Sequence, residues 1–192
     1  MLKEKSFYFA RHGQSLHNEQ GICAGGQSDS PLTEKGIAEA YALKESLASL
    51  SIDHVISSPM IRAKMTAEIA TGRTPIIDEN LREIDIGIFE GKRLDEVGII
   101  EYVKNLDGDH LIPGGESKNG YIAKVTTSVN RLLQAYAGTI LFVAHGFTYA
   151  ALLTSLGRSL EEKDLELKNA VLVHFHHNGQ GWEVKFNSMS MS

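Results

Sequence analysis

A histidine flanked by an arginine and a glycine follows the first apolar run of the chain. The run, residues 6–10 (Ser-Phe-Tyr-Phe-Ala), is rich in aromatic residues, as buried strands are, and Arg11-His12-Gly13-Gln14 comes directly after it. In open α/β sheets, ligands bind beyond the carboxyl ends of the strands. A strand that ends in this way places a cation, a titratable nucleophile and a closely approaching backbone where an anion would bind. The pattern predicts phosphate chemistry carried out by a histidine.

A second strand end has a similar signature. Residues 139–144 (Thr-Ile-Leu-Phe-Val-Ala) are followed by His145 and a glycine, and Arg62 comes shortly after another apolar run at residues 53–57. A single histidine is more often a hydrogen-bonded structural residue than a catalyst. Two strand ends of this kind, however, can converge at one edge of a sheet. The two histidines, with Arg11 and Arg62, therefore indicate one anion-binding site.

The elements that must position these residues alternate along the chain. Thr33 is suited to cap a helix, proline at position 59 suits a first helical turn, and Asn178-Gly179 is a strong hairpin-turn signal. We expect strands at residues 6–10, 53–57, 74–77, 139–144, 170–177 and 181–186, and helices at 33–50, 59–70, 117–136 and 147–156. Glycines and a proline interrupt residues 81–115, which indicates an irregular, lid-like insertion.

This order of elements predicts the fold class. Strands that alternate with helices form a largely parallel sheet with helices on both faces. At 192 residues, the chain is most simply one domain spanning residues 1–192. We therefore expect an α/β fold, a single-domain, three-layer α/β/α sandwich with a mostly parallel central sheet and a C-terminal hairpin.

The composition argues against several classes of function. Hydrophobic residues make up 42% of the chain, which is enough for a core, and the formal net charge of −5 argues against nucleic-acid binding, which needs a basic face. No apolar stretch is long enough to span a membrane. Cys23 is the only cysteine, so no intrachain disulfide forms. These features predict a cytoplasmic protein with no nucleic-acid or membrane partner.

Several motifs in a fixed order relate the chain to a known family. Residues 11–18 (Arg-His-Gly-Gln-Ser-Leu-His-Asn) are similar to the pattern Arg-His-Gly-(Glu/Gln)-(Thr/Ser)-x-x-Asn of the histidine phosphatase superfamily, which includes the cofactor-dependent phosphoglycerate mutases. A single motif is weak evidence, whereas an ordered series is strong. The resemblance continues in the family's order through residues 27–36, 57–63, 81–83, 89–91, 113–117 and 143–146.

The resemblance implies a role for each site residue. His12 attacks phosphorus and forms a phosphohistidine, while Glu83 protonates the leaving alkoxide and then deprotonates the attacking water. No metal and no cofactor is required, because arginine and histidine side chains supply the positive charge. The catalytic set is His12, Glu83, His145, Arg11 and Arg62, and the substrate phosphate is bound by Arg11, Asn18, Arg62, His145 and Gln14.

Some assignments stay open at this point. Glu83 lies next to Arg82 and could simply pair with it at the surface, and Glu90 is a second acidic candidate in the same segment, although the family pattern favours Glu83. His17 stands at a variable position of the motif, where it would either line the mouth of the site or face water.

The phosphoryl acceptor is also open. Our first hypothesis is a metal-independent phosphomonoesterase acting on a small phosphorylated substrate. The segment between Glu83 and His145 is shorter than in the mutases of the family and leaves water better access to the phosphoenzyme. The alternatives are a mutase, in which a substrate hydroxyl replaces water, and an inactive phospholigand-binding module. The physiological substrate and the oligomeric state are not determined, although the exposed edge of the hairpin could pair two subunits into a homodimer.

Overall fold

The computed structural model describes residues 1–99, 108–158 and 167–186. Within these ranges the strands form one sheet in the order β3-β2-β4-β1-β5-β6. Its members are β1 (Phe7–Arg11), β2 (His54–Ser57), β3 (Ile76–Ile77), β4 (Ile140–Ala144), β5 (Leu172–His177) and β6 (Trp182–Phe186). The first four strands in this order are parallel, and β5 and β6 add an antiparallel hairpin beside β1.

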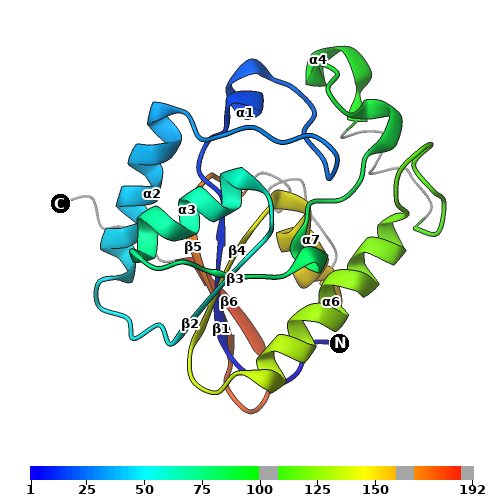
Figure 1. Cartoon of the computed structure of the whole chain (residues 1–192). Helices are drawn as coiled ribbons and strands as arrows, with labels where there is room; N and C mark the ends of the chain where they lie inside the picture. The colour runs from blue at the N-terminus through cyan, green and yellow to red at the C-terminus, as the bar shows by residue number, and fades with distance from the viewer. Residues whose placement is uncertain (100–107, 159–166, 187–192) are drawn as a thin grey trace.

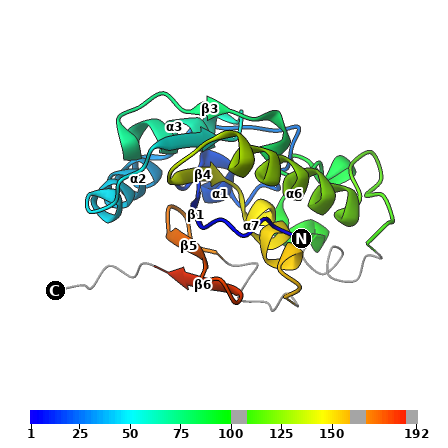
Figure 2. The same cartoon turned by 90° about the horizontal axis from the view of Figure 1, so that it is seen from below.

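Helices cover both faces of the sheet. Figure 2 shows α2 (Glu34–Leu47) and α3 (Ile61–Thr71) on one side of the strands, and α6 (Lys118–Ala135) and α7 (Gly146–Ser155) on the other. Because side chains alternate along a strand, Phe7 and Phe9 of β1 join the core under α6 and α7, while Ala10 joins the core under α2 and α3. The predicted three-layer α/β/α sandwich, with its mostly parallel sheet and C-terminal hairpin, is confirmed.

Caps explain where the helices begin. Thr33 Oγ1 accepts a hydrogen bond from Gly36 N at 3.0 Å, and α2 starts directly after Thr33, as predicted. Helix α3 begins at Ile61, two residues later than the expected start at position 59. A residue distant in sequence supplies its cap, because Asp29 Oδ2 accepts from Ile61 N at 2.5 Å.

The sequence interpretation missed one helix. Helix α1 (Leu16–Gln20) follows the first motif and is held by a reciprocal cap: Asn18 N donates to Ser15 Oγ, and Ser15 N donates to Asn18 Oδ1. It ends at Gly21, whose φ of 66° suits a residue without a side chain. At five residues, the helix is too short to show a hydrophobic period.

The described part of the segment 81–115 lies at the carboxyl ends of the parallel strands. It contains η2 (Gly87–Phe89) and α4 (Leu94–Val97), while residues 100–107 lie outside the described ranges. An isolated bridge pairs Ile22 with Arg93, and Leu94 N donates to Gly21 O at 2.8 Å, so the start of α4 is joined to the residues that follow α1; both helices lie at the same end of the molecule (Figure 1). A lid function of this segment stays a prediction.

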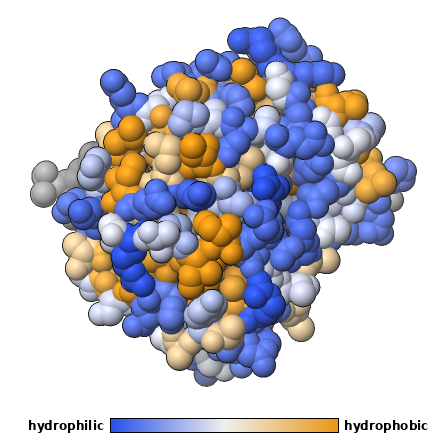
Figure 3. Space-filling view, in the orientation of Figure 1, coloured by the Kyte–Doolittle hydropathy of each residue, from blue (hydrophilic) through white to orange (hydrophobic). Residues whose placement is uncertain are grey.

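The surface shows several apolar areas, one of them at the sheet edge. Figure 3 shows it over the start of α3 and over the edge strand β3, where Ile61, Ile76 and Ile77 are exposed. Strand β3 is only two residues long, which limits pairing with another chain. None of the described helices is both long and apolar enough to cross a membrane.

Candidate active site

His12 follows directly on the last residue of β1, and its ring has one defined tautomer. Nδ1 lies 2.7 Å from the carbonyl oxygen of Gly13. A carbonyl oxygen only accepts, so Nδ1 carries the proton and Nε2 keeps its lone pair. The backbone is fixed as well, because His12 N donates to Ala144 O of β4 and Asn169 Nδ2 donates to His12 O.

The ring of His12 is neutral. Burial lowers the pKa of His12 well below its usual value, and the positive charges of Arg62 and then Arg11 lower it further. Only 3% of the residue is exposed, so water does not compensate a positive charge there. The unprotonated Nε2 is therefore available as a nucleophile at neutral pH.

Gly13 is required for packing. A Cβ at this position would lie 2.5 Å from the carbonyl oxygen of Gly36 in the first turn of α2, so only glycine lets the two backbones approach. Thr66 Oγ1 accepts from Gly13 N at 2.9 Å and completes the turn. The sequence interpretation assigned the close approach of this glycine to a ligand, whereas the structure places α2 there.

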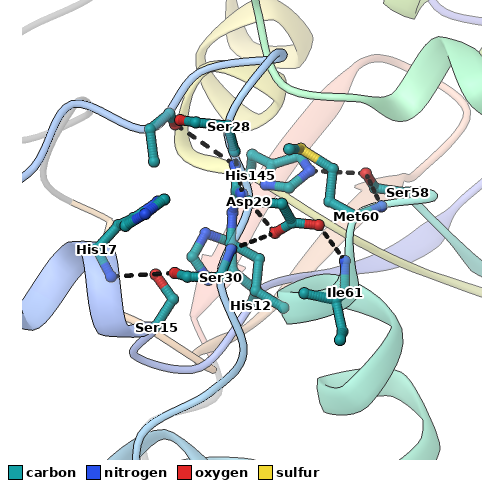
Figure 4. Close-up of polar contacts among 12 residues, drawn as sticks. His12, Ser15, His17, Ser28, Asp29, Ser30, Ser58, Met60, Ile61 and His145 are labelled. Atoms are coloured by element: carbon teal, nitrogen blue, oxygen red, sulfur yellow. Dashed lines mark hydrogen bonds and ion pairs between the residues drawn. The ribbon is translucent and has the colours of Figure 1, made fainter. Parts of the chain in front are cut away.

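His145 faces His12 from the beginning of α7. The two ring centroids are 5.2 Å apart, and His145 Nε2 lies 2.7 Å from Ser58 Oγ. Ser58 is fully buried and its Oγ accepts from Met60 N, and among the described residues His145 Nε2 is the one acceptor within reach of the Ser58 hydroxyl proton, so we assign that proton to the bond with Nε2 (Figure 4). Burial and nearby charges, with Arg62 first, lower the pKa of His145 well below its usual value. The neutral ring therefore carries its proton on Nδ1.

Two buried N–H groups beside His12 have no acceptor. His145 Nδ1 and Arg11 Nε are both buried, and neither has a hydrogen-bond partner among the described residues. The Arg11 guanidinium is oriented by a 2.5 Å hydrogen bond from its NH1 to the carbonyl oxygen of Leu167. Buried donors are rarely left without a partner, so these two indicate the place of an external acceptor such as a phosphoryl oxygen.

Arg62, on the first turn of α3, orders the loop that follows α1. Its terminal nitrogens donate to the carbonyl oxygens of Ala24, Gly25 and Ser28 and form an ion pair with Asp29 Oδ1 at 2.8 Å. The side chain is 1% exposed. Its charge is close enough to lower the pKa of both His12 and His145, so it also contributes to the positive field of the site.

Glu90 supports the same loop, and both of its carboxylate oxygens form hydrogen bonds there. Its two carboxylate oxygens accept hydrogen bonds from Gly25 N at 3.1 Å, Gln27 N at 3.0 Å and Ser28 Oγ at 2.7 Å. Because Gly25 and Ser28 also bind Arg62, the carboxylate of Glu90 helps to position that arginine.

Glu83 points into the protein and away from Arg82. Arg82 pairs with Glu79, whereas Glu83 is buried and its Oε2 accepts from Phe147 N, near the start of α7, at 3.3 Å. Burial raises the pKa of Glu83, although its hydrogen bonds and the charge of Arg62 act in the opposite direction. A raised pKa favours the protonated acid, so Glu83 is a candidate both to give a proton and, once ionised, to take one back.

The remaining predicted residues, Gln14, Asn18 and His17, are partly buried. Gln14 Oε1 accepts from Thr33 Oγ1 at 2.9 Å, which ties this side chain to the start of α2. Asn18 uses its side-chain oxygen in the cap of α1. His17 Nδ1 is buried and lacks a partner among the described residues, so its ring does not simply face water.

Four residues that the sequence interpretation left without a role complete the site. They orient the predicted residues through their polar side chains, and they are Asp29, Ser58, Tyr121 and Asn169. Asp29 and Ser58 lie in quoted motifs, but Tyr121 and Asn169 carry no sequence signal. In the described part of the chain, no group of three His, Cys, Asp or Glu side chains could hold a metal ion.

The chain is similar to known proteins over nearly its whole length. Residues 7–188 match the family described as "Histidine phosphatase superfamily (branch 1)". A Salmonella choleraesuis protein named "Probable phosphoglycerate mutase GpmB" is 36% identical over 186 residues, which cover 91% of this chain and 86% of that protein. The crystal structure of TTHB049 from Thermus thermophilus is 30% identical, with a TM-score of 0.75 over 96% of this chain and all of that one. Bacillus stearothermophilus YhfR is 28% identical, with a TM-score of 0.79 over 95% and 96% of the two chains. With the family matched along this length, the chain belongs to the histidine phosphatase superfamily.

Proposed function

We propose that this protein is a phosphatase that hydrolyses phosphomonoesters through a phosphohistidine on His12. One observation carries the proposal: His12 keeps an unprotonated Nε2, and the neighbouring Arg11 and His145 each have a buried nitrogen, Arg11 Nε and His145 Nδ1, without a hydrogen-bond partner among the described residues. A phosphoryl group would accept from both while its phosphorus faces His12. The family match supports phosphoryl transfer as the chemistry.

The first half of the reaction forms the phosphoenzyme. His12 Nε2 donates its electron pair to phosphorus, and the bond from phosphorus to the ester oxygen breaks. The leaving oxygen takes the proton held by Glu83. Arg11, Arg62 and His145 stabilise the charge on the three phosphoryl oxygens during the transfer.

The second half regenerates the enzyme. A water molecule attacks the phosphohistidine, the bond between phosphorus and Nε2 breaks, and Glu83, now ionised, takes the proton from the water. Inorganic phosphate then leaves, and His12 and Glu83 return to their starting protonation states. Dividing one displacement into two lets a single carboxyl group serve as acid and then as base.

A mutase is the second candidate, because the Salmonella relative is named as one. It uses the same first half, and a substrate hydroxyl then takes the phosphoryl group in place of water. We favour hydrolysis because of the shorter segment between Glu83 and His145. Incubation with 3-phosphoglycerate and its bisphosphate primer separates the two candidates: isomerisation faster than phosphate release would establish the mutase.

The proposal is tested by phosphate release from p-nitrophenyl phosphate with excess chelator. We expect release by the native chain, none by His12→Ala, and native release by His54→Asn, a control that changes a histidine at the far end of β2. A phosphoenzyme labile to acid should form on the native chain alone. Native activity in His12→Ala, or no release from any of several natural esters, would overturn the proposal.

A further inference from the structure

A buried tyrosine of α6 reaches the candidate proton donor. Tyr121 is 2% exposed, and its hydroxyl donates to Glu83 Oε1 at 3.1 Å. The same hydroxyl lies 2.9 Å from Thr148 Oγ1 in the first turn of α7. Three segments distant in sequence therefore meet at one phenolic oxygen.

The direction of these hydrogen bonds follows from the number of protons. An ionised carboxylate has no proton to donate, so the single proton of the Tyr121 hydroxyl is directed to Glu83. The bond to Thr148 must then run the other way, with Thr148 Oγ1 donating to the tyrosine oxygen. The result is a chain of donors from Thr148 through Tyr121 to Glu83, in which each bond polarises the next.

The two oxygens of Glu83 are held differently. Oε1 accepts from Ile84 N at 3.0 Å as well as from Tyr121, whereas Oε2 has one longer bond, 3.3 Å from Phe147 N. An oxygen with two donors is the poorer place for a proton. On the basis of the proposed function, we propose that Tyr121 is a positioning residue that holds Oε1 and makes Oε2 the oxygen that gives the proton to the leaving group and takes it from water.

The groups around Glu83 determine how the Tyr121 hydroxyl affects the pKa of the carboxyl group. Arg11 comes from β1, Arg62 from α3 and Tyr121 from α6, while α7 contributes Phe147 N. Burial raises the pKa of Glu83 and the Tyr121 hydroxyl lowers it. Removing the hydroxyl should therefore favour the protonated acid, which suits the first half of the reaction and slows the second.

Tyr121→Phe removes the hydroxyl and keeps the ring. In a carbon-13 NMR titration of the glutamate side chains, which needs no turnover, we expect the Glu83 midpoint to move up by roughly one pH unit. Thr126→Val is the matched control, because it removes another hydroxyl of α6, one without a hydrogen-bond partner among the described residues, and it should not move the midpoint. An unmoved midpoint in folded Tyr121→Phe would overturn the inference.

Kinetics give a second readout. The alkaline limb of kcat/KM, which requires protonated Glu83, should shift upward with the midpoint, and more phosphoenzyme should accumulate at a given pH. In a Glu83→Gln background, Tyr121→Phe should cause no shift, because the titrating group is gone. Thr148→Val, which keeps the tyrosine but removes its donor, should shift the midpoint less and in the same direction. It serves as the test if Tyr121→Phe does not fold, and an unmoved midpoint there would count against the proposal.

This design separates the two claims. Absence of a phosphoenzyme in the native chain would refute the proposed function and leave the NMR titration to report on Tyr121 alone. Normal turnover with an unmoved Glu83 midpoint would refute the role of Tyr121 and leave the proposed function intact.

Discussion

Ser58→Ala should show whether catalysis depends on the tautomer of His145, because it removes the hydroxyl that donates to the ring and leaves the histidine itself in place. Ser58 Oγ lies 2.7 Å from His145 Nε2, and both residues are fully buried. The hydroxyl donates to Nε2 and so keeps the imidazole proton on Nδ1, which in the proposed mechanism donates to the phosphoryl group. Without Ser58 Oγ, His145 Nε2 is left without a hydrogen-bond donor in the core, and the tautomer with the proton on Nδ1 is no longer favoured.

The size of the effect follows from the burial. Leaving a buried donor or acceptor unsatisfied costs about 1–3 kcal/mol. If the whole cost appears in the transition state, where His145 donates to the phosphoryl group, kcat falls about 5- to 150-fold, at about 1.36 kcal/mol for each factor of ten. We expect a smaller change in KM, because the substitution leaves the positive charges of Arg11 and Arg62, which the proposed mechanism assigns to the phosphate, in place.

Ser57→Ala is the matched control. Ser57 is equally buried and adjacent, but its hydroxyl donates to the carbonyl oxygen of Ser58 at 2.9 Å and does not touch His145. Steady-state kinetics and thermal melting of both variants separate catalysis from stability. Ser57→Ala should lose stability but keep a kcat close to the native value. A native kcat in Ser58→Ala, or equal losses of kcat in the two variants, would refute the reasoning.

Three further changes are predicted from the contacts of the site. Glu83→Gln should reduce kcat about 10²- to 10⁴-fold for alkyl phosphates, whose leaving groups need a proton, and less for activated aryl phosphates; equal losses along a leaving-group series would point to another acid. The lowered pKa values of His12 and His145 mean that the protein takes up protons when it unfolds below the pKa of a free histidine, about 6.5. The stability that the two neutral rings contribute is therefore complete above this pH and is lost below it, by up to about 1.36 kcal/mol per pH unit for each ring. Urea unfolding across this range should show the slope, and variants with asparagine at either position should flatten it. Glu90→Gln disturbs the loop that orients Arg62 and should raise KM, with inorganic phosphate inhibiting less strongly, while an unchanged KM would show that the loop holds its shape without the carboxylate.

Local sequence signals were sufficient for most of the sheet. An aromatic-rich run before Arg11 and an apolar run before His145 predicted β1 and β4, because a buried parallel strand needs consecutive apolar residues. The start of α2 was predicted by Thr33, whose cap is three residues away in sequence. Helix α3 began later than expected because its cap, Asp29, lies 32 residues away.

The sequence was less informative about glutamates and loops. Glu83 and Glu90 belong to the same irregular segment, yet Glu83 turns toward α6 and α7 while Glu90 binds the loop at 25–28. The local sequence does not determine the direction of either side chain, because the partners of both glutamates come from segments distant in sequence. Helix α1 was missed for a related reason: its reciprocal cap has a sequence signature, but five residues give no hydrophobic period.

The residue types and their order were enough to identify a superfamily, a layered fold and a set of residues suited to phosphoryl transfer. This is because strand ends, caps and motifs are encoded within a few positions. The protonation states and the orientation of those residues depend on tertiary structure. Ser58 and His145 are 87 residues apart, and Glu83 and Tyr121 are 38 apart, yet each pair shares a buried hydrogen bond. Hydrogen-bond direction and desolvation, which decide where a proton resides, exist only once the chain has folded around them.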